Sequence, residues 1–183
     1  MRVFSTFLAL ALSTSPVFAQ TQGDVGFKGL IPGSTLSQCV DAAARIGATL
    51  KRRDFNTKRD PKGNVITFDY MFDPMMTGLT LAESKVDQGS ATFVPSSPEP
   101  RLSKLSVVIS YDEYDKVRDA LENRYGKPTF VYGGLVVWEK GNASVSYSKQ
   151  FDDSLEHSIV MFGDMNLSGQ EKKKETAKAA SDL

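Results

Sequence analysis

The sequence has little of the residues that carry most metal and redox chemistry. Its 183 residues include one cysteine, Cys39, and one histidine, His157. One cysteine cannot form an intrachain disulfide, and one cysteine with one histidine is too few for a Cys/His zinc site. The 22 basic residues balance 22 acidic ones, so the charge excess typical of a nucleic-acid-binding protein is absent. We therefore expect no cofactor, no metal and no nucleic-acid partner.

Long apolar runs are also absent after the N-terminus. Arg2 precedes an almost unbroken apolar run over 3–12, which is shorter than the ~20 residues that span a membrane. Small residues then occupy the two positions that a signal peptidase reads before Gln20. This pattern predicts a signal peptide over 1–19, cleaved after Ala19. The simple signal and the lack of cysteine pairs favour a Gram-negative periplasm.

The composition after the signal is that of a globular protein. Apolar residues make up 40% of the chain and charged residues 24%. We expect a single domain over 20–167. From Ser168 the sequence has almost no large apolar residue, which predicts a disordered polar tail over 168–183.

Two helices are predicted from their capping patterns. Thr35 with Gln38, and Ser110 with Glu113, each have the spacing of a capping box, and each is followed by apolar residues at helical spacing and a terminating glycine. Strands are predicted between and after them. Their ranges are 25–31, 65–72, 79–86, 91–94, 105–109, 130–138 (broken at a Gly-Gly pair), 143–148 and 158–162.

The two halves of the domain are alike in outline. A proline-rich segment over 95–100 separates 25–94 from 101–163, and each half has a strand, a capped helix and then antiparallel strands. A duplication is therefore one hypothesis. With or without it, the pattern predicts a two-layer α+β domain, with two helices packed on an antiparallel sheet.

The candidates for catalysis are few. His157 has the acidic neighbours Asp152, Asp153 and Glu156 in sequence, which would suit a metal site or an acid/base pair, but a surface histidine also fits. Cys39 has no nearby base, so it is expected to be buried or to form an intermolecular disulfide. Acidic residues on or near predicted strands have no distinguishing pattern and are expected to be solvated; they are Asp69, Asp73 and Glu83. Neither a nucleophile elbow nor a phosphate-binding glycine loop is present.

Two groups of side chains could contact a partner. The first is a basic set, defined as Lys51, Arg52, Arg53, Lys58, Arg59 and Lys62. It would suit lipid headgroups, phosphates or an acidic protein face, although a solvated hairpin tip also explains it. The second is a methionine group that could form an adaptable apolar patch or fill gaps in the core. Its members are Met71, Met75 and Met76.

Gly33-Ser34-Thr35-Leu36, running into a short helix, resembles the repeated unit of small bacterial envelope proteins related to the outer-membrane-assembly lipoprotein SmpA/OmlA. The β-lactamase-inhibitor protein has a similar architecture. The resemblance covers 29–50, with an echo over 110–148. In those proteins a methionine stands where this chain has Ser34, and the assembly lipoproteins begin with a lipidated cysteine that this chain lacks. The resemblance implies an envelope location and a protein-binding role.

The sequence therefore favours an exported, periplasmic, non-enzymatic protein that binds another envelope macromolecule, either a protein or an anionic component. The basic set is its first candidate surface. Three alternatives remain open: a small-ligand carrier, a hydrolase with a pocket between helices and sheet, or an inhibitor of an envelope enzyme.

Overall fold

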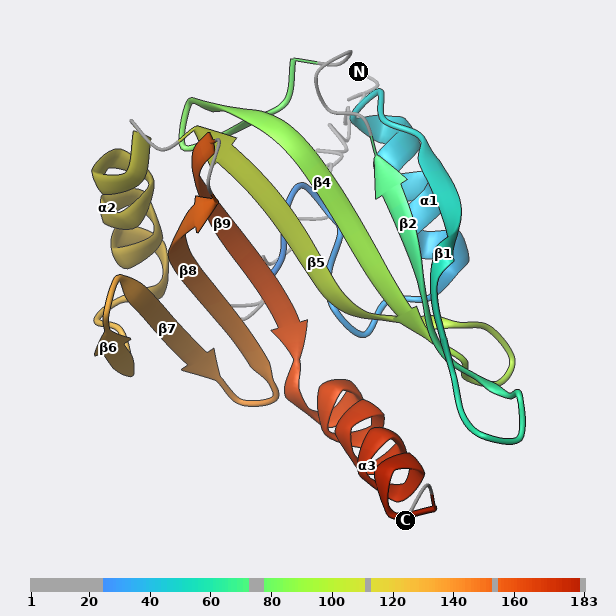
Figure 1. Cartoon of the computed structure of the whole chain (residues 1–183). Helices are drawn as coiled ribbons and strands as arrows, with labels where there is room; N and C mark the ends of the chain where they lie inside the picture. The colour runs from blue at the N-terminus through green and yellow to red at the C-terminus, as the bar shows by residue number, and fades with distance from the viewer. Residues whose placement is uncertain (1–24, 73–77, 111–112, 153–154, 182–183) are drawn as a thin grey trace, which may run out of the picture.

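The computed structural model describes residues 25–72, 78–110, 113–152 and 155–181 (Figure 1). The helices are α1 (Leu36–Arg45), α2 (Tyr114–Tyr125) and α3 (Met165–Ser181). The strands are β1 (Leu50–Arg59), β2 (Val65–Phe72), β3 (Thr80–Leu81), β4 (Ser84–Val94), β5 (Arg101–Ser110), β6 (Phe130–Tyr132), β7 (Leu135–Lys140), β8 (Ala143–Asp152) and β9 (Leu155–Asp164).

The strands form one antiparallel sheet in the order β1-β2-β4-β5-β9-β8-β7-β6, and β3 pairs with β4. The two sequence halves share this sheet, because β4 of the first half pairs with β5 of the second. The proline-rich segment over 95–100 is therefore the connection between two paired strands. The sheet ends at β1 on one side and at β6 on the other.

The expected two-layer α+β fold with two helices is wrong. About half of the chain is strand and about a quarter is helix, and the helices number three among the described residues. The helices α1 and α2 have only 10 and 12 residues, so each covers part of the sheet and neither forms a layer. The strand β1 is not among the predicted strands, because charged residues hide its alternation.

One face of the sheet holds the core. Alternate residues of each strand point to the same face, and paired residues on neighbouring strands share it. In this way Phe68, Ala91, Leu105, Phe162 and Tyr147 come to one side, where they are buried. The same core cluster contains apolar side chains of α1, α2 and the segment before α1. In Figure 1, α1 lies behind β1 and β2.

The segment before α1 is not a strand, contrary to the prediction for 25–31. Its pairing is a single bridge in which Phe27 and Leu30 exchange backbone hydrogen bonds of 3.0 and 2.9 Å. Both side chains are buried in the core. This segment therefore forms a tight turn that contributes apolar side chains under the sheet.

The first predicted capping box is confirmed and the second is wrong. The Thr35 side chain accepts a hydrogen bond from the Gln38 backbone, and the Gln38 side chain accepts one from the Thr35 backbone. Ser110 instead lies in β5, and the residue that precedes α2, Glu113, makes no side-chain cap. Its carboxylate accepts a hydrogen bond of 2.6 Å from the Ser84 hydroxyl, on another element. The spacing rule cannot detect this tertiary partner.

A helix, α3, occupies most of the predicted disordered tail. The Asp164 carboxylate accepts hydrogen bonds of 2.9 and 3.0 Å from the backbone of Asn166 and Leu167, which caps the first turn. The lysines, glutamates and alanines that follow are strong helix formers. α3 contacts β2, β5 and β9 near one end of the sheet. No described helix is long and apolar enough to cross a membrane.

Candidate functional site

The face opposite the core is open over most of its width. Figure 1 is viewed onto this face, and α3 lies at the lower end of the face in that view. Two rows of paired residues cross it from β6 to β2 or β4, and we call these rows the open-face patch. One row is Phe130, Val137, Ser146, Met161, Ser106, Ser90 and Met71. The other is Tyr132, Leu135, Ser148, Ile159, Val108 and Gln88.

The open-face patch contains no charged side chain, in a chain that is 24% charged. Every member except Ser148 keeps accessible surface. Charged residues of both signs lie in the neighbouring row, where Asp69, Lys104 and Glu139 occupy the same face. A centre depleted of charge and a charged rim are features of many protein–protein interfaces.

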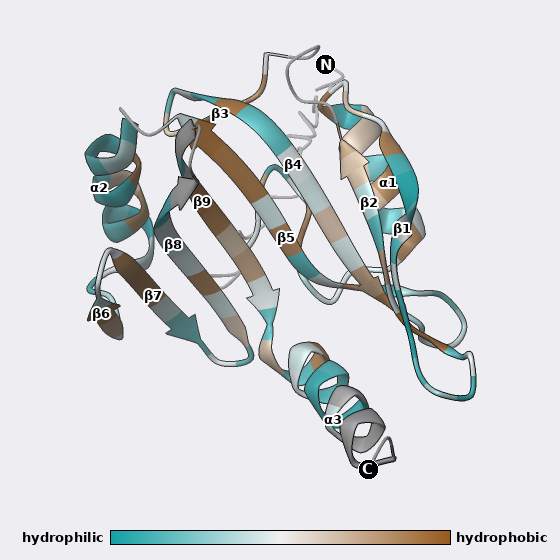
Figure 2. Cartoon of the chain, viewed as in Figure 1, coloured by the Kyte–Doolittle hydropathy of each residue, from teal (hydrophilic) through white to brown (hydrophobic). Residues whose placement is uncertain are grey.

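The open-face patch ends at β6, whose side chains are all exposed. The exposed fractions are 51% for Phe130, 55% for Val131 and 75% for Tyr132. They are three of the five large apolar side chains that are exposed in the described residues, with Val40 and Met165. Figure 2 shows β6 and the first half of β7 in hydrophobic brown, in contrast with the hydrophilic β1 at the other edge.

The basic set does not form one convergent site. Arg52 lies between Lys51 and Arg53 along the edge strand β1. Its side chain therefore points to one face of the sheet, and those of Lys51 and Arg53 point to the other. Arg52 points to the core side, where its guanidinium lies 5.0 Å from the centre of the Phe68 ring and 2.8 Å from the Asp54 carboxylate. Charged side chains on an edge strand oppose pairing with another sheet.

The rest of the basic set lies at the tip of the β1–β2 hairpin. Arg59 donates a hydrogen bond of 2.9 Å to the carbonyl of Gly63. Lys62 lies in the turn after Asp60, whose carboxylate accepts the Lys62 backbone N–H at 2.9 Å. The Arg59 side chain therefore has a local structural role as well as its charge, whereas Lys62 contributes to the turn only through its backbone.

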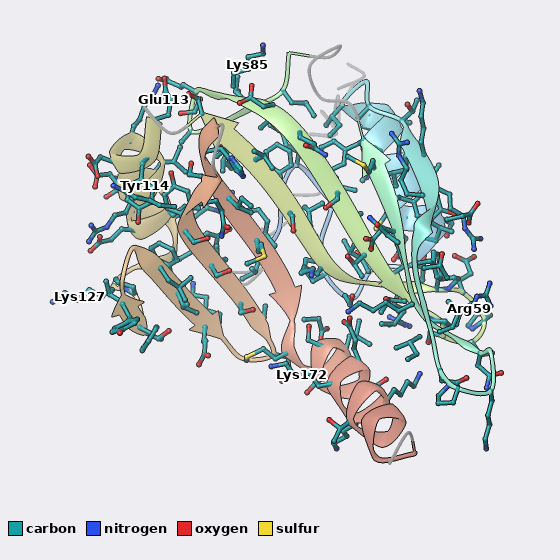
Figure 3. All side chains as sticks on the ribbon, viewed as in Figure 1. Arg59, Lys85, Glu113, Tyr114, Lys127 and Lys172 are labelled. Carbon is teal, nitrogen blue, oxygen red and sulfur yellow. The ribbon has the colours of Figure 1, made fainter. Side chains whose placement is uncertain are left out.

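The structure brings a second basic segment beside this hairpin. The Lys58 ammonium lies 3.2 Å from the Glu171 carboxylate of α3. Glu171 is followed by Lys172, Lys173 and Lys174, which are exposed. Arg59 and Lys172 are labelled in Figure 3 at this end of the molecule. The sequence alone does not predict this surface, because its two segments are more than a hundred residues apart.

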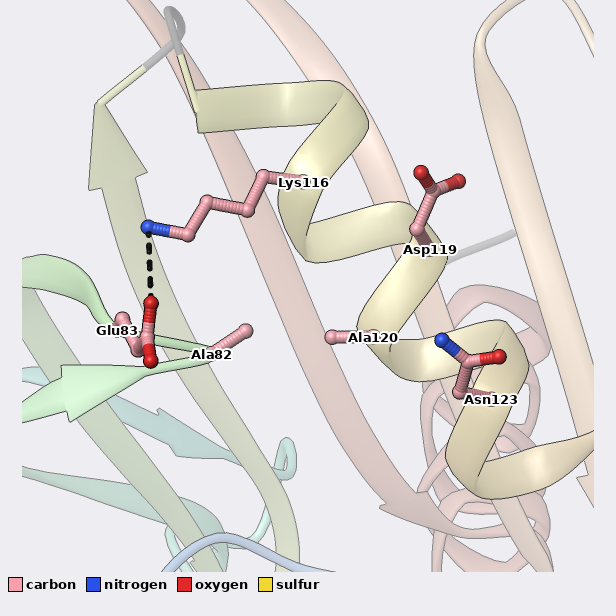
Figure 4. Close-up of a pocket in the computed structure, with 6 residues that line it drawn as sticks. All are labelled: Ala82, Glu83, Lys116, Asp119, Ala120 and Asn123. Atoms are coloured by element: carbon pink, nitrogen blue, oxygen red, sulfur yellow. Dashed lines mark ion pairs between the residues drawn. The ribbon is translucent and has the colours of Figure 1, made fainter.

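A cleft lies between α2 and the turn that joins β3 to β4 (Figure 4). Its volume is about 540 Å³, and it is lined by Ala82, Glu83, Lys116, Asp119, Ala120 and Asn123. The Lys116 ammonium lies 3.7 Å from the Glu83 carboxylate and 3.4 Å from that of Glu113. The cation at the rim is therefore already neutralised, and no histidine, cysteine or serine is among the lining residues.

Glu113 stays ionised beside this cleft. Its pKa is lowered mainly because the Ser84 hydroxyl donates to its carboxylate, and also by the nearby Lys116 ammonium. A carboxylate held in this state is a poor general acid at neutral pH. The cleft can therefore offer hydrogen bonds and charge to a ligand.

The remaining candidates are placed apart from one another. Cys39 is a buried free thiol on α1, and burial raises its pKa to about 11. His157 lies in β9, paired with Gln150, at the end of the open face. No group of three or more metal-ligating side chains occurs in the part of the chain that the structure describes.

The acidic candidates and the methionine group are only partly described. Asp69 is half-buried on the open face, and Glu83 is exposed at the β3–β4 turn. Met71 belongs to the open-face patch. Asp73, Met75 and Met76 lie outside the described residues, as do Asp153 and the side chains of Asp152 and Glu156.

The chain matches no protein-family model, no curated protein and no solved structure. The resemblance to the SmpA/OmlA-related envelope proteins is not tested by these comparisons and stays a prediction.

Proposed function

We propose that this chain is an exported, non-enzymatic protein of the bacterial periplasm that binds another protein of the cell envelope through the open-face patch. The observation that carries the proposal is the charge-free centre of this face. Monomeric proteins rarely expose a large contiguous apolar patch, and this patch combines serines with Met, Val, Ile, Leu and aromatic residues along two rows without charge.

The chemistry of the patch selects the kind of partner. An anionic polymer or a phosphate needs cations, and the two rows contain none. The four serines are small, so they keep the centre of the sheet accessible to an approaching surface. The rim carries both signs of charge, so a partner with an apolar centre and a mixed-charge rim is complementary.

The proposal is tested by cross-linking pull-down from intact envelopes. Met161 lies on β9 near the middle of the patch, and Met161→Lys places a charge there. Asn123→Lys is the matched control, because it adds the same charge on the exposed side of α2. We expect a specific protein partner with the parent chain and with Asn123→Lys, and at least ~10-fold less with Met161→Lys. Equal capture by all three chains would contradict the use of this face.

A second candidate surface is the basic set together with the lysines of α3. The contact between Lys58 and Glu171 favours it, because this contact brings a cationic segment of the first half of the sequence beside the lysines of α3. An anionic envelope component would be its ligand. Replacing the basic set by glutamate should abolish sedimentation with vesicles that contain anionic lipid, while Met161→Lys should not. Unchanged sedimentation would remove this candidate.

A further inference from the structure

The two edges of the sheet differ in charge, and therefore in how readily each can pair with a strand of another molecule. At the β1 edge, Lys51, Arg52 and Arg53 are consecutive, so another copy of β1 would bring like charges together. At the β6 edge, no charged residue occurs anywhere over 128–138. One edge is therefore protected against strand pairing and the other is not.

The backbone of β6 also has hydrogen-bonding groups directed outward. Gly133 and Gly134 have φ of +53° and +85° and join β6 to β7 as a two-residue turn. In such a hairpin the residues that flank the turn, Tyr132 and Leu135, exchange both hydrogen bonds. The next pair, Val131 and Val136, does not, so the N–H and C=O of Val131 point away from β7, toward the free edge.

We infer that β6 pairs with β6 of a second copy of this chain, antiparallel and centred on Val131. Each Val131 then donates its N–H to the carbonyl of the other Val131. Phe130 of one copy lies opposite Tyr132 of the other, and aromatic cross-strand pairs of this kind are favourable. The formal net charge of zero adds no general repulsion between copies.

The second copy is the occupant that these observations define. It presents an edge of the same length, without charge and with the same outward groups, so the match is self-complementary. Among the described strands, each copy uses the one end of the sheet that has no charged residues, and the β1 edges that remain outside are charged. Assembly therefore stops at two chains. The two open-face patches become neighbours in one continuous sheet, and this dimer does not depend on the proposed binding function.

The register gives a direct test. In the dimer the two Val131 Cα atoms lie ~5.5 Å apart, within the range of a disulfide, whereas the two Phe130 Cα atoms lie beyond the ~7 Å limit. We expect Val131→Cys to form a disulfide dimer on mild oxidation at least ~10-fold faster than Phe130→Cys. The parent chain should form none, because its one thiol, Cys39, is buried. Equal rates for the two variants would overturn the register.

The strength of association is the second readout. A three-residue edge buries a small area, so the dimer belongs to the weak class and is measured by analytical ultracentrifugation up to ~1 mM chain. Tyr132→Lys should weaken it at least ~10-fold, because a charge then enters the joined edge. Thr80→Lys, an exposed position in β3, adds the same charge elsewhere and should leave it unchanged. A chain that stays monomeric over the whole range would overturn the proposal, whatever the outcome of the pull-down.

Discussion

The ring of Phe72 covers Gly89 in the neighbouring strand. The two residues are paired in register between β2 and β4. A Cβ added at Gly89 would lie 2.0 Å from the Cζ of Phe72, far inside van der Waals contact. Gly89 therefore leaves the space in which the Phe72 ring packs on the core side of the sheet.

Gly89→Ala should destabilise the protein by about 2 kcal/mol or more, because the new methyl group overpacks a full site. Phe72→Leu alone should also destabilise, through lost burial. The two together should cost less than the sum of the single substitutions, because the smaller side chain makes room for the methyl group. Urea denaturation of the four chains measures this coupling, and strict additivity would contradict the packing described.

Tyr147 attaches α2 to the sheet. Its hydroxyl lies 3.1 Å from the carbonyl of Tyr114 and 3.0 Å from the Ser158 hydroxyl, and its ring stacks on that of Tyr114 at 4.5 Å. Tyr147→Phe should lower the free energy of unfolding by about 1–2 kcal/mol, because buried partners lose a hydrogen bond. Tyr132→Phe is the control, and it should change stability by less than ~0.5 kcal/mol. Equal effects of both substitutions would refute the role of the Tyr147 hydroxyl.

The same tyrosine predicts a pH dependence. Burial raises the pKa of Tyr147 to about 12, above its ordinary value of 10. Between pH 10 and 12 the Tyr147 hydroxyl is therefore mostly protonated in the folded state and mostly ionised in the unfolded state. The stabilising contribution is complete below pH 10 and is lost as the pH rises toward 12. The stability difference between the parent chain and Tyr147→Phe should therefore shrink over this interval, and a constant difference would contradict the raised pKa.

Cys39 should be unreactive in the folded protein. It is buried in α1, and its pKa of about 11 leaves little thiolate at pH 8. We expect a thiol reagent to label it on the time scale of unfolding, and immediately in denaturant. Fast labelling of the folded chain, or an intermolecular disulfide in the isolated protein, would show that the thiol is accessible.

The N-terminal cap of α3 gives a local prediction. Asp164→Ala removes the acceptor for two backbone N–H groups, which typically costs about 1 kcal/mol. Hydrogen exchange over 165–176 should therefore accelerate, while exchange in the core strands β5 and β9 changes little. Uniform acceleration across the sheet would mean that α3 is part of the global folding unit.

The sequence predicts those parts of the fold that depend on local signals. The alternation over 65–72, the first capping box and the Gly133-Gly134 break all correspond to observed features. Each arises from residues that are neighbours in the chain. The single strand predicted over 79–86 is instead β3, a turn and the start of β4, because Ala82 and Glu83 adopt positive φ despite having side chains.

The candidate site was less accessible to sequence reasoning. The open-face patch draws its residues from β2, β4, β5 and the four strands from β6 to β9, and only the pairing register aligns them. Tyr132 lies in a predicted strand, yet it is exposed because its strand is at the sheet edge. The absence of charge over 128–138 is the sequence signal for this surface. The basic set is the more conspicuous feature of the sequence.

Site-specific photo-cross-linking in intact envelopes shows whether a protein partner contacts the open-face patch. A photoreactive side chain would replace Met161 in the patch, Arg53 in the basic set, or Asn123 on α2, one at a time. We predict a discrete protein adduct from position 161 and none from position 123. Adducts from position 53 with none from position 161 would contradict the account and move the binding surface to the β1 edge.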